Sequence, residues 1–322
     1  MKKLRTLLSI TAEKSEDMKW ITRVDTGIPP FNINYDDKIL FLGSCFAQEI
    51  GIIMQNMGFE CLVNPFGVLY NPASIAGSLE RLVSATPFCS SDIIRNGDVY
   101  KSIYHSSDYA EMSEEALLRK INTSLEQSSA FFKQSDVIAL TLGTTWLYKL
   151  QSDGRTVANC HKLPSNAFSR EFLSAEQCIS LLEPVIRKNQ DKRWIISVSP
   201  VRHLKDGAHE NQLSKARLLI AADELSRRYS NVCYFPSYEI VMDELRDYRF
   251  YAADMIHLSR EATDYIWERF AEFILDEKSE ELLKDYKRLY EMKSHRPLFP
   301  ESKSYKEFEK RLCDLEEKLK KR

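Results

Sequence analysis

The chain has 322 residues, 43% of them hydrophobic, which is enough for one large domain and excludes a small scaffold that depends on disulfides or metals. Its 45 Lys and Arg residues nearly balance its 47 Asp and Glu residues and are spread along the chain, so no basic patch of a nucleic-acid-binding protein is expected. The seven cysteines are scattered and form no C-x-x-C pair, which favours free thiols of a reducing compartment over disulfides or a thiolate zinc site.

The N-terminus begins with positive charges and a short apolar stretch. Lys2, Lys3 and Arg5 precede this stretch, which ends in the acidic segment 12–17 and is too short for a secretory signal. No run of about 18 apolar residues occurs anywhere, so we expect no membrane span and no membrane partner. We therefore expect a cytoplasmic protein in which residues 1–34 form an N-terminal extension.

Short apolar runs rich in β-branched residues alternate with amphipathic segments along the chain. Buried parallel strands have this continuous apolar character, and parallel strands need crossover connections, which helices supply. The fold class is therefore predicted to be α/β, with a parallel sheet covered on both faces. The expected strands cover 39–42, 59–63, 137–142, 194–198 and 232–235.

Helices are expected between these strands, where apolar residues recur at helical spacing. The first helix should stop at Gly58, because glycine is favoured just beyond a helix C-terminus. Ser174 and Gln177 have capping-box spacing, and Ser259 is a second expected N-cap. The expected helices cover about 46–57, 73–84, 114–132, 175–185, 211–229 and 260–274, and the buried face of the fifth is expected to include Leu213 and Ile220.

Two insertions interrupt the alternation of strands and helices. Residues 64–112 are rich in Pro, Gly, Ser and Asn around the short third helix. A second insertion is a hairpin in which Asp153-Gly154 joins strands at 146–151 and 155–160. This hairpin leaves the C-terminal end of the third strand, which is the edge where ligands bind in open α/β sheets.

The tail from residue 301 to 322 is highly charged but carries an apolar stripe at helical spacing. It is predicted to form an appended amphipathic helix. The main domain is therefore expected to span residues 35–300.

Two groups of residues have the composition of a nucleophilic catalytic site. Gly43, Ser44 and Cys45 lie where the first strand gives way to a helix, so a hydroxyl and a thiol are placed at a tight turn. Asp254 and His257 follow far downstream, just before a capped helix. Nucleophilic catalysis needs a nucleophile, a base that takes its proton and a group that orients the base. The pattern predicts a hydrolase or an acyl transferase.

The segment Gly43-Ser44-Cys45-Phe46-Ala47 spells the signature of the GSCFA family, which is similar to the SGNH (GDSL-like) hydrolases. The resemblance covers roughly residues 35–275 and implies a three-layer α/β/α fold with a flavodoxin-like parallel sheet. It also implies that Asp254 orients His257 and that His257 acts as the general base. Supporting stretches are 64–72, 142–144, 159–162 and 199–203.

The SGNH pattern begins with Gly-Asp-Ser, so the same register places Cys45 at the nucleophile position. A helix N-terminus and a nearby histidine would both favour a thiolate there. The alternative assignment makes Ser44 the nucleophile and packs Cys45 as a small apolar residue.

The resemblance also implies donors for an oxyanion. The backbone N–H of the nucleophile is the first candidate. Gly67 is the counterpart of the SGNH glycine, and in Gly143-Thr144-Thr145 the last residue, Thr145, replaces the SGNH asparagine. Asn64 or Asn71 is an alternative third donor.

Other candidate residues follow the middle strands. His161 follows the predicted hairpin and is expected to reach the same sheet edge. Arg202, next to His203 after the fourth strand, suits a clamp for a substrate carboxylate or phosphate. No metal-ligand spacing occurs among the histidines, so we expect neither a metal nor a cofactor.

We expect an esterase that acts on an acyl or acetyl ester, including esters of saccharides. Two alternatives remain open at this stage. One is an O-acyltransferase that uses a sugar hydroxyl as acceptor. The other is a non-catalytic saccharide-binding protein on a degenerate hydrolase fold. The expected partner in each case is a small molecule or a saccharide.

Overall fold

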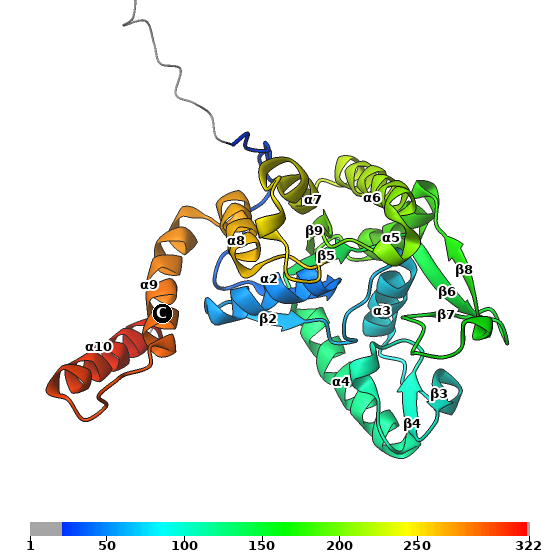
Figure 1. Cartoon of the computed structure of the whole chain (residues 1–322), viewed down its shortest axis with the longest axis horizontal. Coiled ribbons are helices and arrows are strands. Elements are labelled where there is room, and N and C mark those ends of the chain that lie inside the picture. The colour runs from blue at the N-terminus through cyan, green and yellow to red at the C-terminus, as the bar shows by residue number, and fades with distance from the viewer. Residues whose placement is uncertain (1–20, 321–322) are drawn as a thin grey trace, which may run out of the picture.

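A five-stranded parallel sheet forms the centre of the molecule in the computed structural model, which describes residues 21–320 (Figure 1). All five predicted strands are confirmed. Strands of a parallel sheet are covered on both faces, which explains their continuous apolar runs. In sheet order they are β10 (Val232–Phe235), β9 (Arg193–Val198), β5 (Val137–Leu142), β1 (Lys38–Gly43) and β2 (Glu60–Val63).

Numbered along the chain, these strands follow the order 2-1-3-4-5, the doubly wound order of flavodoxin-like sheets. Such a sheet binds ligands outside the carboxyl ends of the strands, where the winding direction reverses. That point lies between β1 and β5, whose register pairs Gly43 with Thr141. The fold therefore places the segment after Gly43 at the expected ligand edge.

Helices cover both faces of the sheet, which confirms the mixed α/β fold. Alternate residues of a strand face opposite sides, so Ile39 and Phe41 join one core cluster while Leu40 and Leu42 join the other. The first cluster packs under α2 (Cys45–Asn56) and α8 (Arg260–Ile274). The second packs under α3 (Pro72–Ser84), α4 (Glu114–Gln134), α5 (Ala175–Lys188) and α6 (Ala208–Arg228).

The predicted caps of two helices are confirmed. Ser174 and Gln177 form a reciprocal capping box at the start of α5, and the Ser259 hydroxyl accepts a hydrogen bond from the N–H of Ala262 in α8. The expected face of α6 is partly wrong, because Leu213 and Ile220 are exposed. The first turns of α6 cover the ligand edge of the sheet and bury polar side chains instead, namely Asn211, Ser214 and Lys215.

The insertions contain more β-structure than expected. Within 64–112, β3 (Ile93–Asn96) and β4 (Val99–Ser102) form a hairpin. The predicted Asp-Gly hairpin is present as β6 (Trp146–Leu150) and β7 (Thr156–Val157), and β8 (Phe168–Phe172) adds a third strand. After β10 the chain forms α7 (Ser237–Glu239) and a π-helical turn, Ile240–Glu244.

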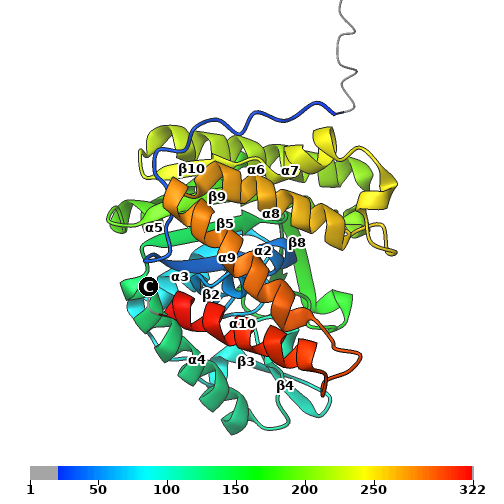
Figure 2. The same ribbon diagram turned by 90° about the vertical axis from the view of Figure 1, so that its left-hand side faces the viewer.

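Two helices follow the main body and pack side by side, as Figure 2 shows: α9 (Glu277–Ser294) and α10 (Lys303–Lys320). Ion pairs join them, including Lys318 Nζ to Asp285 Oδ2 at 2.7 Å. The Tyr286 ring of α9 stacks on Tyr35 with the centroids 5.0 Å apart, which ties the helical pair to the body.

Residues 1–20 of the N-terminal extension predicted over 1–34 lie outside the described residues. They include the whole of the charged and apolar segment 1–10. Of the described part, Ile33 forms a parallel bridge with Leu275, and the Arg269 guanidinium donates to the carbonyl of Val24. No helix within residues 21–320 is long and apolar enough to cross a membrane.

Candidate active site

The strand-to-helix turn after β1 positions Ser44 and Cys45. Gly43 has φ +140°, and a Cβ atom there would lie 2.2 Å from the carbonyl oxygen of Thr141, so only glycine fits this close approach. The Gly43 N–H donates to Asn64 Oδ1 at 2.9 Å, and the Ser44 N–H donates to the Thr141 carbonyl at 3.1 Å. These bonds fix the turn so that Ser44 is the N-cap of α2 and Cys45 its first residue.

Ser44 and Cys45 differ in accessibility. Ser44 is 1% exposed, and its buried hydroxyl oxygen has no hydrogen-bond partner within residues 21–320. Cys45 is only partly buried and forms no disulfide. A nucleophile must meet its substrate, so the exposure of these two residues favours Cys45.

The Cys45 thiol is protonated at neutral pH. Burial raises the pKa of Cys45 to about 11, and the Glu49 carboxylate adds to this effect. The backbone N–H groups of Phe46 and Cys45 and the charge of Lys215 lower the pKa, but burial outweighs them. The expectation of a resting thiolate at the helix N-terminus is therefore wrong, and the thiol needs a base to react.

Asp254 and His257 form the predicted hydrogen-bonded pair in the loop before α8. His257 Nδ1 lies 2.6 Å from Asp254 Oδ2, while Asp254 Oδ1 accepts the N–H groups of Ile256 and His257 at 2.9 and 3.0 Å. These bonds, led by that from the imidazole, lower the pKa of Asp254 to about 2. The carboxylate thus orients the imidazole from its Nδ1 side and leaves Nε2 for proton transfer. Both side chains are about half exposed.

The Asp254–His257 pair influences residues around Cys45 without a hydrogen bond to the thiol among residues 21–320. Burial raises the pKa of Glu49, which follows Cys45 by one turn of α2, and a charge on His257 lowers it. Burial lowers the pKa of His203, which follows β9, and a charge on His257 lowers it further. Thr263 of α8 also donates to Glu49 Oε2 at 3.3 Å. Among the described residues no hydrogen bond joins Cys45 to His257.

The donors expected for the oxyanion are mostly occupied. The Gly67 N–H donates to the Asn64 carbonyl at 2.7 Å, and the Gly143 N–H donates to the Tyr70 carbonyl at 2.7 Å. Thr145 is fully buried and binds Ser214 of α6 through both its N–H and its hydroxyl. In this structure these three groups are therefore structural donors, because tertiary contacts already satisfy them.

Asn64 is better placed than Asn71 as a side-chain donor. Asn71 caps α3, where its Oδ1 accepts the N–H of Ser74 at 2.8 Å. Asn64 binds Gly43 through its Oδ1, and its Nδ2 is buried without a partner. The side-chain NH₂ group of Asn64 therefore lies beside the nucleophile turn and has no hydrogen-bond partner within residues 21–320.

His161 lies against the β3–β4 hairpin rather than with the groups around Cys45. Its carbonyl accepts from Lys101 Nζ at 2.8 Å and from Asn96 Nδ2 at 3.1 Å. Its side chain is 1% exposed, and burial lowers the pKa of His161 to about 4. The expectation that His161 reaches the catalytic edge is not supported by these contacts.

Arg202 follows β9, as predicted. It is half-buried, its guanidinium lies 3.2 Å from Met242 Sδ, and among residues 21–320 it pairs with no carboxylate. It lines a cavity of about 480 Å³ together with Tyr251 and Met255, which belong to the loop of Asp254 and His257. A second cavity, of about 720 Å³, is lined by α2, α8 and α9 and includes Glu49 and Leu258, the residue after His257.

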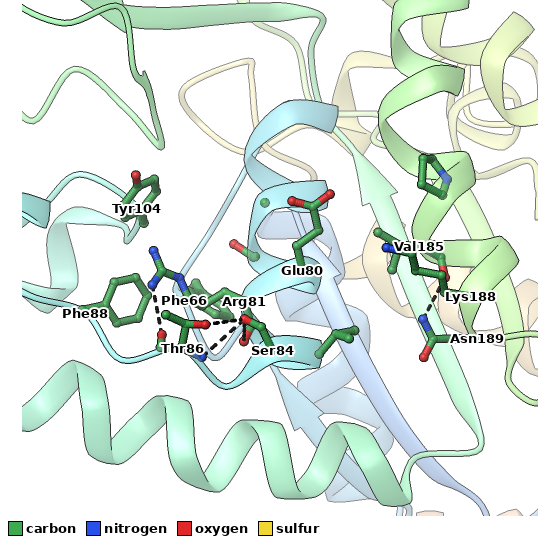
Figure 3. Close-up of a pocket in the computed structure, with 14 residues that line it drawn as sticks. Phe66, Glu80, Arg81, Ser84, Thr86, Phe88, Tyr104, Val185, Lys188 and Asn189 are labelled. Atoms are coloured by element: carbon green, nitrogen blue, oxygen red, sulfur yellow. Dashed lines mark hydrogen bonds between the residues drawn. The ribbon is translucent and has the colours of Figure 1, made fainter.

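A third cavity, also of about 720 Å³, lies between α3 and α5 (Figure 3). Its Arg81 donates to the Thr86 carbonyl at 2.9 Å and lies 4.3 Å from the centroid of the Phe88 ring, so this cation is already engaged. None of the predicted catalytic residues lines this cavity. The cavities beside the Asp254–His257 loop are therefore better candidates for substrate binding.

The sequence interpretation missed Lys215 and Glu49. Lys215 is fully buried on α6, and its ammonium donates to the carbonyls of Gly143 and Ser199, each at 2.6 Å. A lysine among the polar positions of an amphipathic helix gives no signal that it faces inward. Glu49 has a weak signal, because it lies four residues after Cys45 and so on the same face of α2.

Comparison with known protein families gives a match over most of the chain. The model of the GSCFA family matches residues 38–270. No curated protein matches the chain. The matched range includes the nucleophile turn, the Asp254–His257 pair, Arg202 and Lys215. Within residues 21–320, no group of three or more His, Cys, Asp and Glu side chains is arranged to hold a metal ion.

Proposed function

The chain belongs to the GSCFA family, and from this premise we propose that it is an SGNH-type hydrolase of acyl or acetyl esters. The observation that carries the proposal is the position of the accessible Cys45 thiol. It is the first side chain of a helix that begins at the switch point of the sheet.

In the proposed reaction, Cys45 Sγ attacks the carbonyl carbon of the ester while His257 Nε2 takes the thiol proton. Asp254 holds the imidazole and stabilises its charged form. The oxyanion accepts hydrogen bonds from the N–H of Cys45 and from Asn64 Nδ2, which has no other partner within residues 21–320. The half-exposed His257 loop must move toward the thiol for this transfer, because no hydrogen bond joins the two in the described structure.

Collapse of the tetrahedral intermediate breaks the bond to the leaving alcohol, which takes the proton from His257. The resulting thioester on Cys45 is then attacked by water, whose proton passes to His257, and the acid is released with regeneration of the thiol. A sugar hydroxyl in place of water would give the O-acyltransferase alternative. No cofactor enters either sequence.

The cavity lined by Arg202, Tyr251 and Met255 is the proposed site for the part of the substrate beyond the ester group. An aromatic wall packs against the apolar face of a sugar ring or an acyl chain. The unpaired guanidinium of Arg202 suits a carboxylate or phosphate on the substrate.

No hydrogen bond joins Cys45 to His257 within residues 21–320, and this also supports one alternative, a saccharide-binding protein without activity. The two proposals differ in a direct test. A panel of nitrophenyl esters and acetylated saccharides should reveal an ester that the wild-type protein hydrolyses and Cys45→Ala does not. Saccharide binding without hydrolysis of any ester on the panel would favour the binding protein.

A further inference from the structure

The ammonium group of Lys215 is buried at the catalytic edge without a carboxylate partner. Lys215 is 1% exposed, and within residues 21–320 it forms no ion pair. Its Nζ donates to the carbonyl oxygens of Gly143 and Ser199, which follow β5 and β9. An ammonium group has three N–H donors, so one remains after these two bonds.

A buried charge without an opposite charge is costly, and lysine is almost never fully buried unless it is paired. Two carbonyl dipoles compensate part of that cost, but they leave the net positive charge in place. When it is protonated, Lys215 is therefore a cation whose negative partner is not another side chain of the described structure. An anion that forms during a reaction would complete this site.

The Cys45 thiol is the group near Lys215 that can supply such an anion. Lys215 Nζ donates to the carbonyl of Gly143. Gly143 lies two positions after Thr141, and the Thr141 carbonyl accepts the Ser44 N–H. Burial raises the pKa of Cys45 and a charge on Lys215 opposes that rise, while burial lowers the pKa of Lys215 and an ionised Cys45 opposes that fall. The ammonium therefore binds the segment that follows the partner strand of the turn that carries the thiol.

We infer that Lys215 is the counter-ion of the Cys45 thiolate, which forms when the thiol loses its proton. The inference rests on the proposed role of Cys45 as nucleophile. Lys215 then supplies the charge that stabilises the thiolate of the partly buried Cys45, while His257 supplies the base.

Several other charged or titratable groups face this pair and set its pH dependence. Burial and the Arg202 charge lower the pKa of Lys215 to about 7, whereas Cys45 raises it. The Tyr238 ring centroid lies 5.9 Å from Lys215 Nζ, and Glu49 opposes ionisation of the thiol. Burial and the Lys215 charge lower the pKa of His203 to about 4, so His203 stays neutral from about pH 6 to about pH 9. Lys215 is thus charged below about pH 7 and neutral well above it, so its help to the thiolate is present at low pH and is lost as pH rises.

The test measures how fast iodoacetamide alkylates Cys45 in wild-type protein and in Lys215→Gln, by peptide mapping from about pH 6 to about pH 9. Glutamine can still donate to the two carbonyls but carries no charge. The wild-type rate should exceed the variant rate by about tenfold or more near pH 6, and the two rates should converge near pH 9. A ratio that does not change with pH would overturn the inference, because loss of packing alone acts equally at every pH.

Lys192→Gln is the matched control. Lys192 is also buried, and its ammonium donates to the Ser135 carbonyl at 2.8 Å, but it lies at the start of β9, at the opposite end of the strand from Ser199. Its Cys45 alkylation profile should match that of the wild type. A pH-dependent loss of reactivity in Lys192→Gln equal to that in Lys215→Gln would also overturn the inference.

Lys215→Arg gives an independent reading if the neutral variant does not fold. A guanidinium stays charged throughout this range, so Lys215→Arg should keep its reactivity advantage near pH 9 while the wild type loses it. Coinciding profiles would contradict the counter-ion role. Alkylation needs no ester, so a protein without esterase activity would count against the proposed function and leave this inference intact.

Discussion

Cys45→Ala is expected to abolish ester hydrolysis, with a loss of the order of 10⁶-fold, because no other accessible nucleophile lies at the turn. Ser44→Ala should keep turnover within about tenfold and should unfold at nearly the same temperature. The Ser44 hydroxyl accepts no hydrogen bond from an N–H of α2 and has no other hydrogen-bond partner within residues 21–320. Its removal therefore breaks no hydrogen bond of the described structure.

The two variants are each other's control, since both alter one atom beyond Cβ at adjacent positions. Initial rates on one good ester and a thermal unfolding curve for each protein suffice. If Ser44→Ala were inactive and Cys45→Ala active, Ser44 would be the nucleophile and the register would have to be reversed.

His257→Ala is expected to lower turnover by about 10⁴-fold or more, and Asp254→Asn by about 10³-fold to 10⁴-fold. Asparagine can still accept the backbone N–H groups of Ile256 and His257, so the loop should keep its shape. What changes is the bond to His257 Nδ1, where an amide no longer stabilises the charged imidazole. The half-exposed positions of both side chains predict little change in the unfolding temperature.

Because nucleophile and base act as one unit, the double variant Cys45→Ala/His257→Ala should lose little more than either single variant. His295→Ala removes an exposed imidazole outside the site and should behave as the wild type. Full turnover in His257→Ala would contradict its role as the base.

The central sheet and the nucleophile turn were predictable from the sequence because each depends on local patterns. Strands buried on both faces are continuous apolar runs, and Gly43 to Cys45 lie directly at a strand-to-helix change. The short strands of the β3–β4 hairpin were missed, because polar residues such as Arg95 and Lys101 interrupt any apolar alternation.

The oxyanion donors and the inward face of α6 were not predictable in the same way. Whether the N–H of Gly67 or Thr145 is free depends on partners that only the folded chain brings near, such as Ser214. Lys215 looks like a solvent-facing lysine until the first turns of α6 are placed over the sheet edge. Burial likewise reversed the expected ionisation of Cys45.

The most direct measurement of the central claim is the covalent intermediate. Wild-type protein is mixed briefly with excess p-nitrophenyl acetate and quenched in acid, and its peptides are mapped by mass spectrometry. We predict one acetyl group on the peptide that contains Ser44 and Cys45, held as a thioester on Cys45, and no acetyl group on this peptide in Cys45→Ala. Acetylation of Ser44, or of surface lysines alone, would contradict the account.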